Sequence, residues 1–409
     1  MEEEVVVVIV GAGPSGLATS ACLTLFSIPN IILEREDCSS SLWKKRTYDR
    51  LKLHLAKKFC YLPYMPHPST TPTFISKKAF IKYMDDYVSN FKLSPNYFRS
   101  VESATYGDVT KRWHIEAKNT ASNQKEVYVA EFLVVATGEN SEGYIPRLPG
   151  LSSFRGEVIH SSEYKSGWKY HNKEVMVVGC GNSGMEIAFD LASHGAHTSI
   201  VVRSPVSSLS LSLSLVSKLG VPPACMHYFH VLNKEMVYLG MFLLKYLPIS
   251  AVDPLIIFLA NLMYGNLTKY GISRPEKGPF YLKATTGRSP VIDVGTVEKI
   301  KMGHIQVFPA ISSIKENDVT FDNGKMHQYD AILFATGYKS TANNWLKDYS
   351  YCLNNDGMPK NTFPNHWKGQ NGLYCAGMSK RGLFGVSMDA KAIASDIQMV
   401  INGKEKKPK

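Results

Sequence analysis

Apolar and polar positions along the chain fall into blocks that predict strands followed by helices. The run Val5 to Val10 is continuously apolar, as is typical of a strand buried on both faces, and the small and apolar residues from Leu17 to Phe26 predict a helix. A second strand is expected at Glu174 to Val178 and a second helix at Met185 to Ser193. A short glycine-rich turn joins each strand to its helix, so the same unit occurs twice.

The first turn has the spacing of a dinucleotide-binding loop, Gly11-Ala12-Gly13-Pro14-Ser15-Gly16. In such a loop Gly11 permits the tight turn, Gly13 lets a pyrophosphate approach the backbone, and Gly16 lets the helix pack on the strand. The next expected strand, Ile31 to Leu33, ends in Glu34, whose carboxylate could accept both ribose hydroxyls. Glu34 could also be a surface acid at the end of a strand.

The second turn repeats this spacing, Gly179-Cys180-Gly181-Asn182-Ser183-Gly184. Here the next strand, Ser199 to Val202, ends in Arg203, and a guanidinium suits a 2′-phosphate that a carboxylate would repel. The contrast between Glu34 and Arg203 therefore predicts FAD in the first unit and NADPH in the second.

Two further apolar strands both end in Ala-Thr-Gly, at Phe132 to Gly138 and at Ala331 to Gly337. Small residues at the carboxyl ends of parallel strands lie where ligands bind in open α/β sheets, although ordinary strand-to-turn chemistry is the alternative. We assign Thr137 and Gly138 to the FAD site and Thr336 and Gly337 to the NADPH site.

The order of these parts predicts an α/β protein with two Rossmann-like dinucleotide-binding domains, the NADPH domain inserted into the FAD domain. The expected limits are 1–155 for the first part of the FAD domain, 156–329 for the NADPH domain and 330–409 for the returning part. A length of 409 residues fits two or three domains of roughly 150 residues.

Composition narrows the classes of partner. The net charge of +11 would suit nucleic acid, an acidic membrane surface or an anionic cofactor, but no aromatic and basic nucleic-acid motif occurs, so nucleic acid is not expected. Seven widely spaced cysteines form no CxxC pair and no metal-ligand pattern, which favours a reduced compartment and predicts no metal.

The segment Met236 to Leu267 is the most apolar in the chain. Lys245, Pro248, Asp253 and Pro254 interrupt it before the roughly 20 residues that a membrane span needs, so packed helices are expected. Attachment to a membrane surface is the alternative.

One motif between the two units is more specific than the glycine turns. Residues 154–164 match the pattern FxGxxxHxxxY/F at each fixed position, namely Phe154, Gly156, His160 and Tyr164. This resembles the signature of flavin monooxygenases, whose Baeyer-Villiger relatives usually carry Trp at the last position. His160 could be a hydrogen-bonded structural histidine that couples the cofactor domains or a group that transfers a proton. We favour the structural reading.

Several longer blocks resemble the plant YUCCA group in particular. They are Ser41 to Leu55, Gly271 to Pro275, Thr286 to Gly295 and Asp356 to Lys360, so the resemblance spans nearly the whole chain. It also implies that Arg35, Leu42 and Trp43 contact FAD and that Ser204 contacts NADPH.

The YUCCA resemblance implies an NADPH- and FAD-dependent monooxygenase that uses molecular oxygen. Its expected reaction is the oxidative decarboxylation of indole-3-pyruvate to indole-3-acetate, in auxin biosynthesis, through a C4a-peroxyflavin. The chemistry would reside on the flavin, so no catalytic side chain is assigned. A cytoplasmic location is implied, and association with the surface of the endoplasmic reticulum stays open.

The chain departs from the YUCCA pattern at 204–229, which looks inserted and could perturb NADPH binding at Arg203.

Two alternative functions stay open: an N- or S-oxygenating flavin monooxygenase, and a non-catalytic regulator that binds flavin or NADPH. A flavin disulfide reductase would share both dinucleotide sites, but it needs a cysteine pair after the first acidic strand, where only Cys38 occurs.

Overall fold

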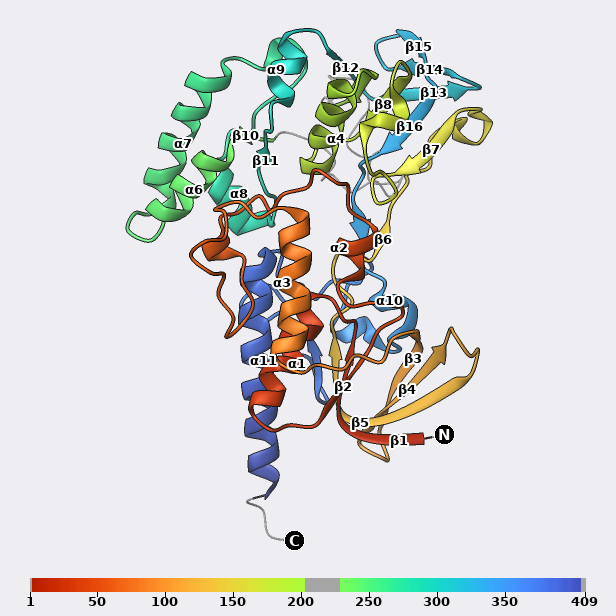
Figure 1. Cartoon of the computed structure of the whole chain (residues 1–409), viewed down its shortest axis with the longest axis vertical. Helices are drawn as coiled ribbons and strands as arrows, with labels where there is room; N and C mark the ends of the chain where they lie inside the picture. The colour runs from red at the N-terminus through yellow and green to blue at the C-terminus, as the bar shows by residue number, and fades with distance from the viewer. Residues whose placement is uncertain (1, 203–228, 406–409) are drawn as a thin grey trace. The chain divides into compact units, whose positions relative to one another are not determined.

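The computed structural model describes residues 2–202 and 229–405, which divide into two compact units. The first unit contains Met1–Gly143 and Gly337–Lys409, and the second contains Tyr144–Thr336, so the second unit is inserted into the first (Figure 1). The expected limits at 155/156 and 329/330 both fall inside the second unit. Leu148, Leu151 and Phe154 explain the earlier limit, because they pack on the core of the second unit.

The first unit is built on a six-stranded sheet with the order β2-β1-β5-β4-β3 and β18 beside β5. Its strands are β1 (Glu2–Val10), β2 (Asn30–Leu33), β3 (Arg99–Gly107), β4 (Arg112–Asn119), β5 (Lys125–Val135) and β18 (Leu373–Cys375). Strands β1, β2, β5 and β18 are parallel, whereas β3 and β4 add an antiparallel edge.

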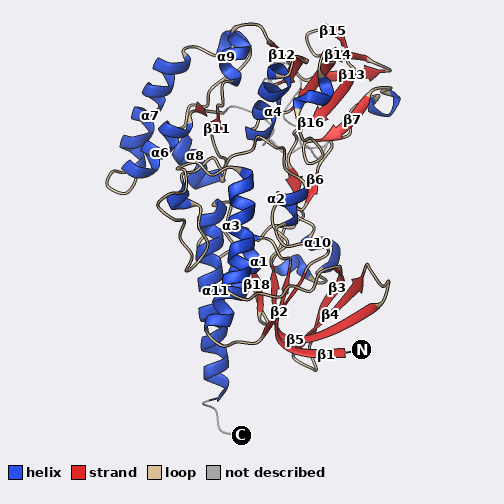
Figure 2. Cartoon of the chain, in the orientation of Figure 1, coloured by secondary structure: helices blue, strands red, loops and turns tan. Residues whose placement is uncertain are grey.

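Most of the helices of the first unit cover one face of its sheet (Figure 2). The helices of this unit are α1 (Pro14–Leu25), α2 (Ser41–Lys45), α3 (Lys77–Asn90), α10 (Ala342–Trp345) and α11 (Gly382–Glu405). Alternate residues of β1 enter two different clusters: Val7 and Ile9 pack with α1, α3 and α11, whereas Val8 and Val10 pack toward β3, β4 and α10. The apolar run is therefore buried on both faces, as its pattern predicts.

The second unit has a five-stranded parallel sheet with the order β12-β9-β8-β16-β7. Its strands are β7 (Glu157–His160), β8 (Glu174–Val178), β9 (His197–Val201), β12 (Ile305–Phe308) and β16 (Ala331–Phe334). Strand β16 pairs with both β8 and β7. The expectation that the first domain resumes at 330 is therefore incorrect for this strand, which lies in the interior of the second sheet.

The remaining strands and helices complete both units. They are the pairs β6 (Glu142–Gly143) with β17 (Tyr338–Lys339) and β10 (Val231–Leu232) with β11 (Val291–Ile292), the antiparallel sheet β13 (Ile311–Lys315), β14 (Asp318–Phe321) and β15 (Met326–Gln328), and the helices α4 (Asn182–Ser193), α6 (Lys234–Leu243), α7 (Ile249–Tyr264), α8 (Pro279–Thr286) and α9 (Thr296–Lys301).

The apolar segment from Met236 to Leu267 forms packed helices, as predicted. Asp253 of α7 is buried, and its carboxylate accepts hydrogen bonds from the backbone N–H groups of Phe280 (2.9 Å) and Tyr281 (3.0 Å) in the first turn of α8. An acid at the start of a helix satisfies N–H groups that have no partner within the helix. In the part of the chain that the structure describes, no helix is long and apolar enough to cross a membrane.

The FxGxxxHxxxY segment attaches the edge strand β7 to helix α4. The hydroxyl of Tyr164 donates to Oδ2 of Asp190 in α4 (2.6 Å), and the N–H of Gly167 donates to the same oxygen (2.9 Å). A side chain at Gly156 would overlap the carbonyl oxygen of Asp330. The N–H of Ser162 donates to Nδ1 of His160 (3.2 Å), which also lies 3.0 Å from Oγ of Ser162. These contacts favour the structural reading of His160.

We predict that Tyr164→Phe lowers the free energy of unfolding by about 1–3 kcal/mol, because it leaves one bond fewer to a buried carboxylate. Chemical denaturation monitored by circular dichroism measures the change. Tyr246→Phe is the control, since Tyr246 is 72% exposed and its hydroxyl can bond to water. Equal stabilities of the two variants would contradict this account of the motif.

Candidate dinucleotide-binding sites

Backbone geometry at the first glycine turn shows why side chains are excluded there. Gly11 has φ +110°, and a Cβ on it would lie 2.7 Å from the carbonyl oxygen of Ala136. A Cβ on Gly16 would overlap the carbonyl oxygen of Gly11, so α1 packs directly on the turn. A Cβ on Gly13 would meet no protein atom within 4 Å. The turn therefore leaves open space at Gly13, at the start of α1, where a pyrophosphate could approach.

Glu34 lies at the end of β2 and is buried beside this turn. Its Oε2 accepts the N–H of Ala12 (2.7 Å), and its Oε1 accepts the N–H of Glu36 (3.0 Å). Burial raises the pKa of the Glu34 carboxyl, although these two N–H groups and the charge of Arg35 act in the opposite direction. The carboxylate is thus fixed in position, and its remaining lone pairs can accept ribose hydroxyls.

A cavity of about 620 Å³ extends from the first glycine turn along the carboxyl ends of the strands. Most of the residues that the sequence assigns to FAD line it: Gly11, Gly13, Pro14, Ser15, Glu34, Arg35, Leu42, Trp43, Thr137 and Gly138. The other two, Ala12 and Gly16, lie behind the lining. Ala12 donates its N–H to Glu34, and Gly16 packs on the turn.

Three buried polar atoms on the wall of this cavity have no hydrogen-bond partner within the described residues: Oγ of Ser40, Oγ1 of Thr137 and Nε1 of Trp345. Leaving such groups unpaired costs free energy, so these residues of the cavity lining have hydrogen-bonding capacity left for a polar ligand. Sequence analysis found Thr137 but missed the other two. Trp345 reaches the cavity from α10, far along the chain, and no local pattern marks it.

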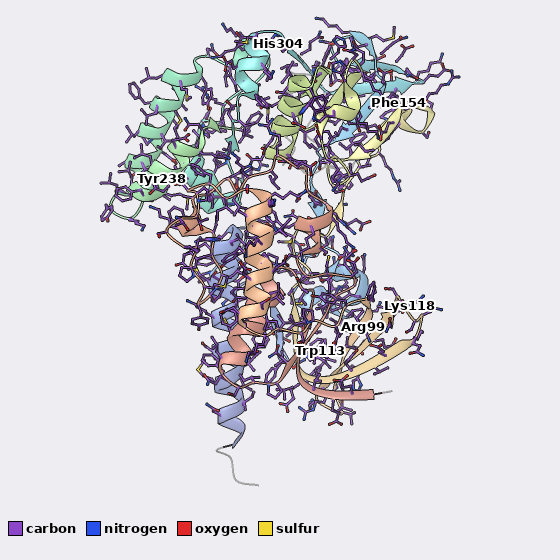
Figure 3. The ribbon with its side chains drawn as sticks, viewed as in Figure 1. Arg99, Trp113, Lys118, Phe154, Tyr238 and His304 are labelled. Atoms are coloured by element: carbon purple, nitrogen blue, oxygen red, sulfur yellow. The ribbon has the colours of Figure 1, made fainter. Side chains whose placement is uncertain are left out.

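Charged side chains of both signs line the cavity, the arginines Arg35, Arg46 and Arg99 together with the glutamates Glu34, Glu139 and Glu142. Arg35 and Arg46 both donate to the carbonyl oxygen of Ser141, at 3.2 and 3.4 Å, and Arg46 also pairs with Glu36 (2.9 Å). Arg99, labelled in Figure 3, lies on β3 and reaches the lining while its guanidinium pairs with Glu126 (3.0 Å). An anionic dinucleotide therefore meets guanidinium groups already held in place.

The second glycine turn has the same backbone geometry. Gly179 has φ +110°, and a Cβ on it would lie 2.5 Å from the carbonyl oxygen of Ala335. A Cβ on Gly184 would overlap the carbonyl oxygen of Gly179, and one on Gly181 would meet nothing within 4 Å. This turn can therefore also cradle a pyrophosphate, with α4 starting at Asn182.

Side chains at the second turn have two uses. Asn182 ties the turn to β11, because its Oδ1 accepts the N–H of Ile292 (2.7 Å) and its Nδ2 donates to the carbonyl oxygen of Pro290 (3.3 Å). Beside it lies a cavity of about 230 Å³ whose lining includes Cys180, Gly181, Arg288 and Ser289. Sequence analysis missed Arg288, which lies within the block Thr286 to Gly295.

The remaining NADPH assignments have different outcomes. Ser183 is half-buried in the first turn of α4, and Thr336 donates its hydroxyl to the carbonyl oxygen of Tyr144. Gly337 follows Thr336 directly and is the first residue of the first unit as the chain returns to it. Arg203, Ser204 and all but the last residue of 204–229 lie outside the described residues.

Gly13 and Gly16 form a matched pair for a test. Gly16→Ala should lower the free energy of unfolding by about 1–3 kcal/mol or more, because its methyl group overlaps backbone atoms. Gly13→Ala should leave stability nearly unchanged but reduce the bound flavin, since its methyl group occupies the space of the ligand. Thermal unfolding of the flavin-free chain and the flavin-to-protein absorbance ratio measure the two effects. Full flavin retention by Gly13→Ala would contradict the assignment.

Glu34 predicts an unusual pH dependence. Since burial raises its pKa, protonation of this group stabilises the free folded chain, and that stability is lost as the pH rises through the raised pKa. FAD affinity should change in the opposite sense, because the ionised carboxylate is the better acceptor. We expect the affinity to fall with decreasing pH, starting above the pH at which an ordinary glutamate protonates. Fluorescence titration of FAD between about pH 4 and pH 7 measures it.

Glu34→Gln provides the control for this titration. The variant should bind FAD more weakly than the wild type at neutral pH, and its affinity should lack the step that Glu34 produces. Parallel profiles for the two proteins would assign the pH dependence to another group.

Comparison with known proteins places the chain in a family. A family model described as flavin-binding monooxygenase-like matches residues 4–403. The chain is 52% identical to the probable indole-3-pyruvate monooxygenase YUCCA10 of Arabidopsis thaliana, over 97% of this chain and 98% of that relative. It is 45% identical to the probable indole-3-pyruvate monooxygenase YUCCA9 of the same plant, over 98% of this chain and 91% of that relative.

Solved structures share the fold. A flavin-containing monooxygenase from Stenotrophomonas maltophilia aligns with a TM-score of 0.69 at 17% sequence identity, over 98% of this chain and 99% of that one. At this identity the likeness concerns the arrangement of the chain alone, which is that of two Rossmann-type domains.

Proposed function

Because the chain belongs to the flavin-binding monooxygenase-like family and, within it, to the YUCCA group, we propose that it converts indole-3-pyruvate to indole-3-acetate. The reaction consumes one NADPH, one proton and one molecule of oxygen, and it releases carbon dioxide, water and NADP⁺. One oxygen atom from O₂ enters the new carboxylate, and the other leaves as water.

One structural observation supports this proposal in addition to the relatives' names. The two glycine turns have matching backbone geometry, but the side chains around them differ in chemistry. The first leads to a cavity with a buried carboxylate at Glu34 and unpartnered polar atoms, which suits FAD. The second opens at Gly181, beside a cavity that Arg288 helps to line. A chain with two sites of this kind can bind both an electron donor and an electron acceptor.

The residues of the first cavity have defined tasks in this proposal. Glu34 accepts the ribose hydroxyls, the backbone at Gly13 receives the pyrophosphate, and Arg46 offsets its charge. Ser40, Thr137 and Trp345 provide the hydrogen-bond donors that fix the orientation of the ligand. When bound, NADPH supplies the electrons with which FAD activates oxygen for attack on the keto carbon.

At the second turn, the backbone of Gly181 and the first turn of α4 receive the pyrophosphate of NADPH. Asn182 holds this turn against Pro290 and β11 by its two hydrogen bonds, and Arg288 lines the same cavity two residues before Pro290. The protein thereby provides binding and orientation, while the redox chemistry belongs to the cofactors.

The test is product analysis with labelled oxygen. The purified flavin-loaded protein, given NADPH and indole-3-pyruvate under ¹⁸O₂, should yield indole-3-acetate that carries one ¹⁸O, with one NADPH oxidised for each product. Catalase must be present, because free hydrogen peroxide also decarboxylates 2-oxo acids. Mass spectrometry reads the label.

Two outcomes would contradict the proposal. Oxidation of NADPH with release of hydrogen peroxide and unchanged keto acid would reject the substrate. Conversion of a thioether or an amine, in place of indole-3-pyruvate, would identify an S- or N-oxygenating enzyme instead.

A further inference from the structure

A separate cavity in the second unit lies at the carboxyl ends of β9 and β12. Its volume is about 460 Å³, and none of its lining residues belongs to the cavity beside Gly181. Val202, the residue directly after β9, forms one wall, and Phe308, the last residue of β12, forms another with Pro309. Lys269 and Tyr270 line it from the segment that follows α7.

The position of this cavity suits the adenosine end of a dinucleotide. In a sheet of this type the glycine turn follows one strand, β8 here, and the ribose of the adenosine is bound at the end of the next strand, which is β9. The cavity begins at that point, because Val202 lies at the end of β9 and is buried. The cavity therefore offers room for an adenosine at the strand end where a sheet of this type binds it.

The chemistry of the wall fits an adenosine that carries a 2′-phosphate. Lys269 is the one charged side chain among the described residues that line the cavity, and it is exposed. Its Nζ lies 5.0 Å from the centroid of the Tyr270 ring. Phe308 and Val202 add buried apolar surface, and Asn323 adds an amide. A flat aromatic ring, an apolar wall and one cation match a purine next to a phosphate.

We propose that Lys269 binds the 2′-phosphate of NADPH and that Tyr270 packs against its adenine. The inference rests on the proposed function, since it names the residues that make the second site selective for NADPH over NADH. Arg203 was the only cation that sequence analysis assigned to this task. Lys269 lies more than sixty residues later, and the fold brings it to the same strand end.

Nucleotide binding tests this directly, without turnover. Isothermal titration calorimetry of the full-length, flavin-loaded protein would compare NADP⁺ and 2′,5′-ADP with NAD⁺ and 5′-AMP. Lys269→Gln should weaken both 2′-phosphorylated ligands about tenfold, the loss of a charge-assisted contact, and leave the other two unchanged. Lys269→Arg should keep most of the affinity. Tyr270→Leu should weaken all four ligands, because the adenine is common to them.

Lys301→Gln is the matched control, since Lys301 is an exposed lysine of α9 that does not line the cavity. It should bind all four ligands as the wild type does. Thermal unfolding midpoints equal to that of the wild type would show that each variant is folded.

The outcomes separate this inference from the proposed function. Wild-type affinity for NADP⁺ with no change in Lys269→Gln, or an equal loss for NADP⁺ and NAD⁺, overturns the role of Lys269 and leaves the monooxygenase proposal standing. Failure of the wild type to bind either NADP⁺ or 2′,5′-ADP would overturn both.

Discussion

Direct packing of a helix on the turn that precedes it is the constraint on which both units depend. At Gly16 and at Gly184 the helix backbone lies so close to the carbonyl oxygen of Gly11 or Gly179 that a single methyl group would not fit. This contact points the first N–H groups of each helix toward the end of the sheet. It also leaves Gly13 and Gly181 facing open space, so a ligand and not a side chain completes each turn.

The two units share this backbone geometry, but they place side chains of opposite charge near the strand end that follows the turn. In the first, a carboxylate is held out of water at Glu34, where burial makes ionisation costly and only two N–H groups and nearby arginine charge offset the cost. In the second, the corresponding strand end opens on a cavity with an exposed lysine. A buried acid suits free ribose hydroxyls, and an accessible cation suits a ribose phosphate, so selectivity follows from what surrounds each strand end and not from the turns.

Sequence analysis recovered the parts of this arrangement that local pattern encodes. The glycine spacing, the strand end at Glu34 and the apolar run of β1 depend on residues close together in the chain. The apolar run of β16 also predicted a buried strand, but its pattern could not tell which sheet it joins, and it lies in the second unit between β8 and β7. Ser40, Trp345 and Lys269 escaped detection because tertiary structure alone brings them to their cavities.

The signature segment shows how distant positions can act on a site without touching a ligand. Tyr164 donates to Asp190 in α4, and α4 starts directly after Gly181, so the hydrogen bond fixes the helix whose first turn faces the pyrophosphate. Asn182 holds the other side of the same turn against β11. His160 is bonded within its own turn, to Ser162. Tyr164 therefore belongs to the contacts that hold α4, the helix that begins directly after Gly181, although it lies far from that turn in the sequence.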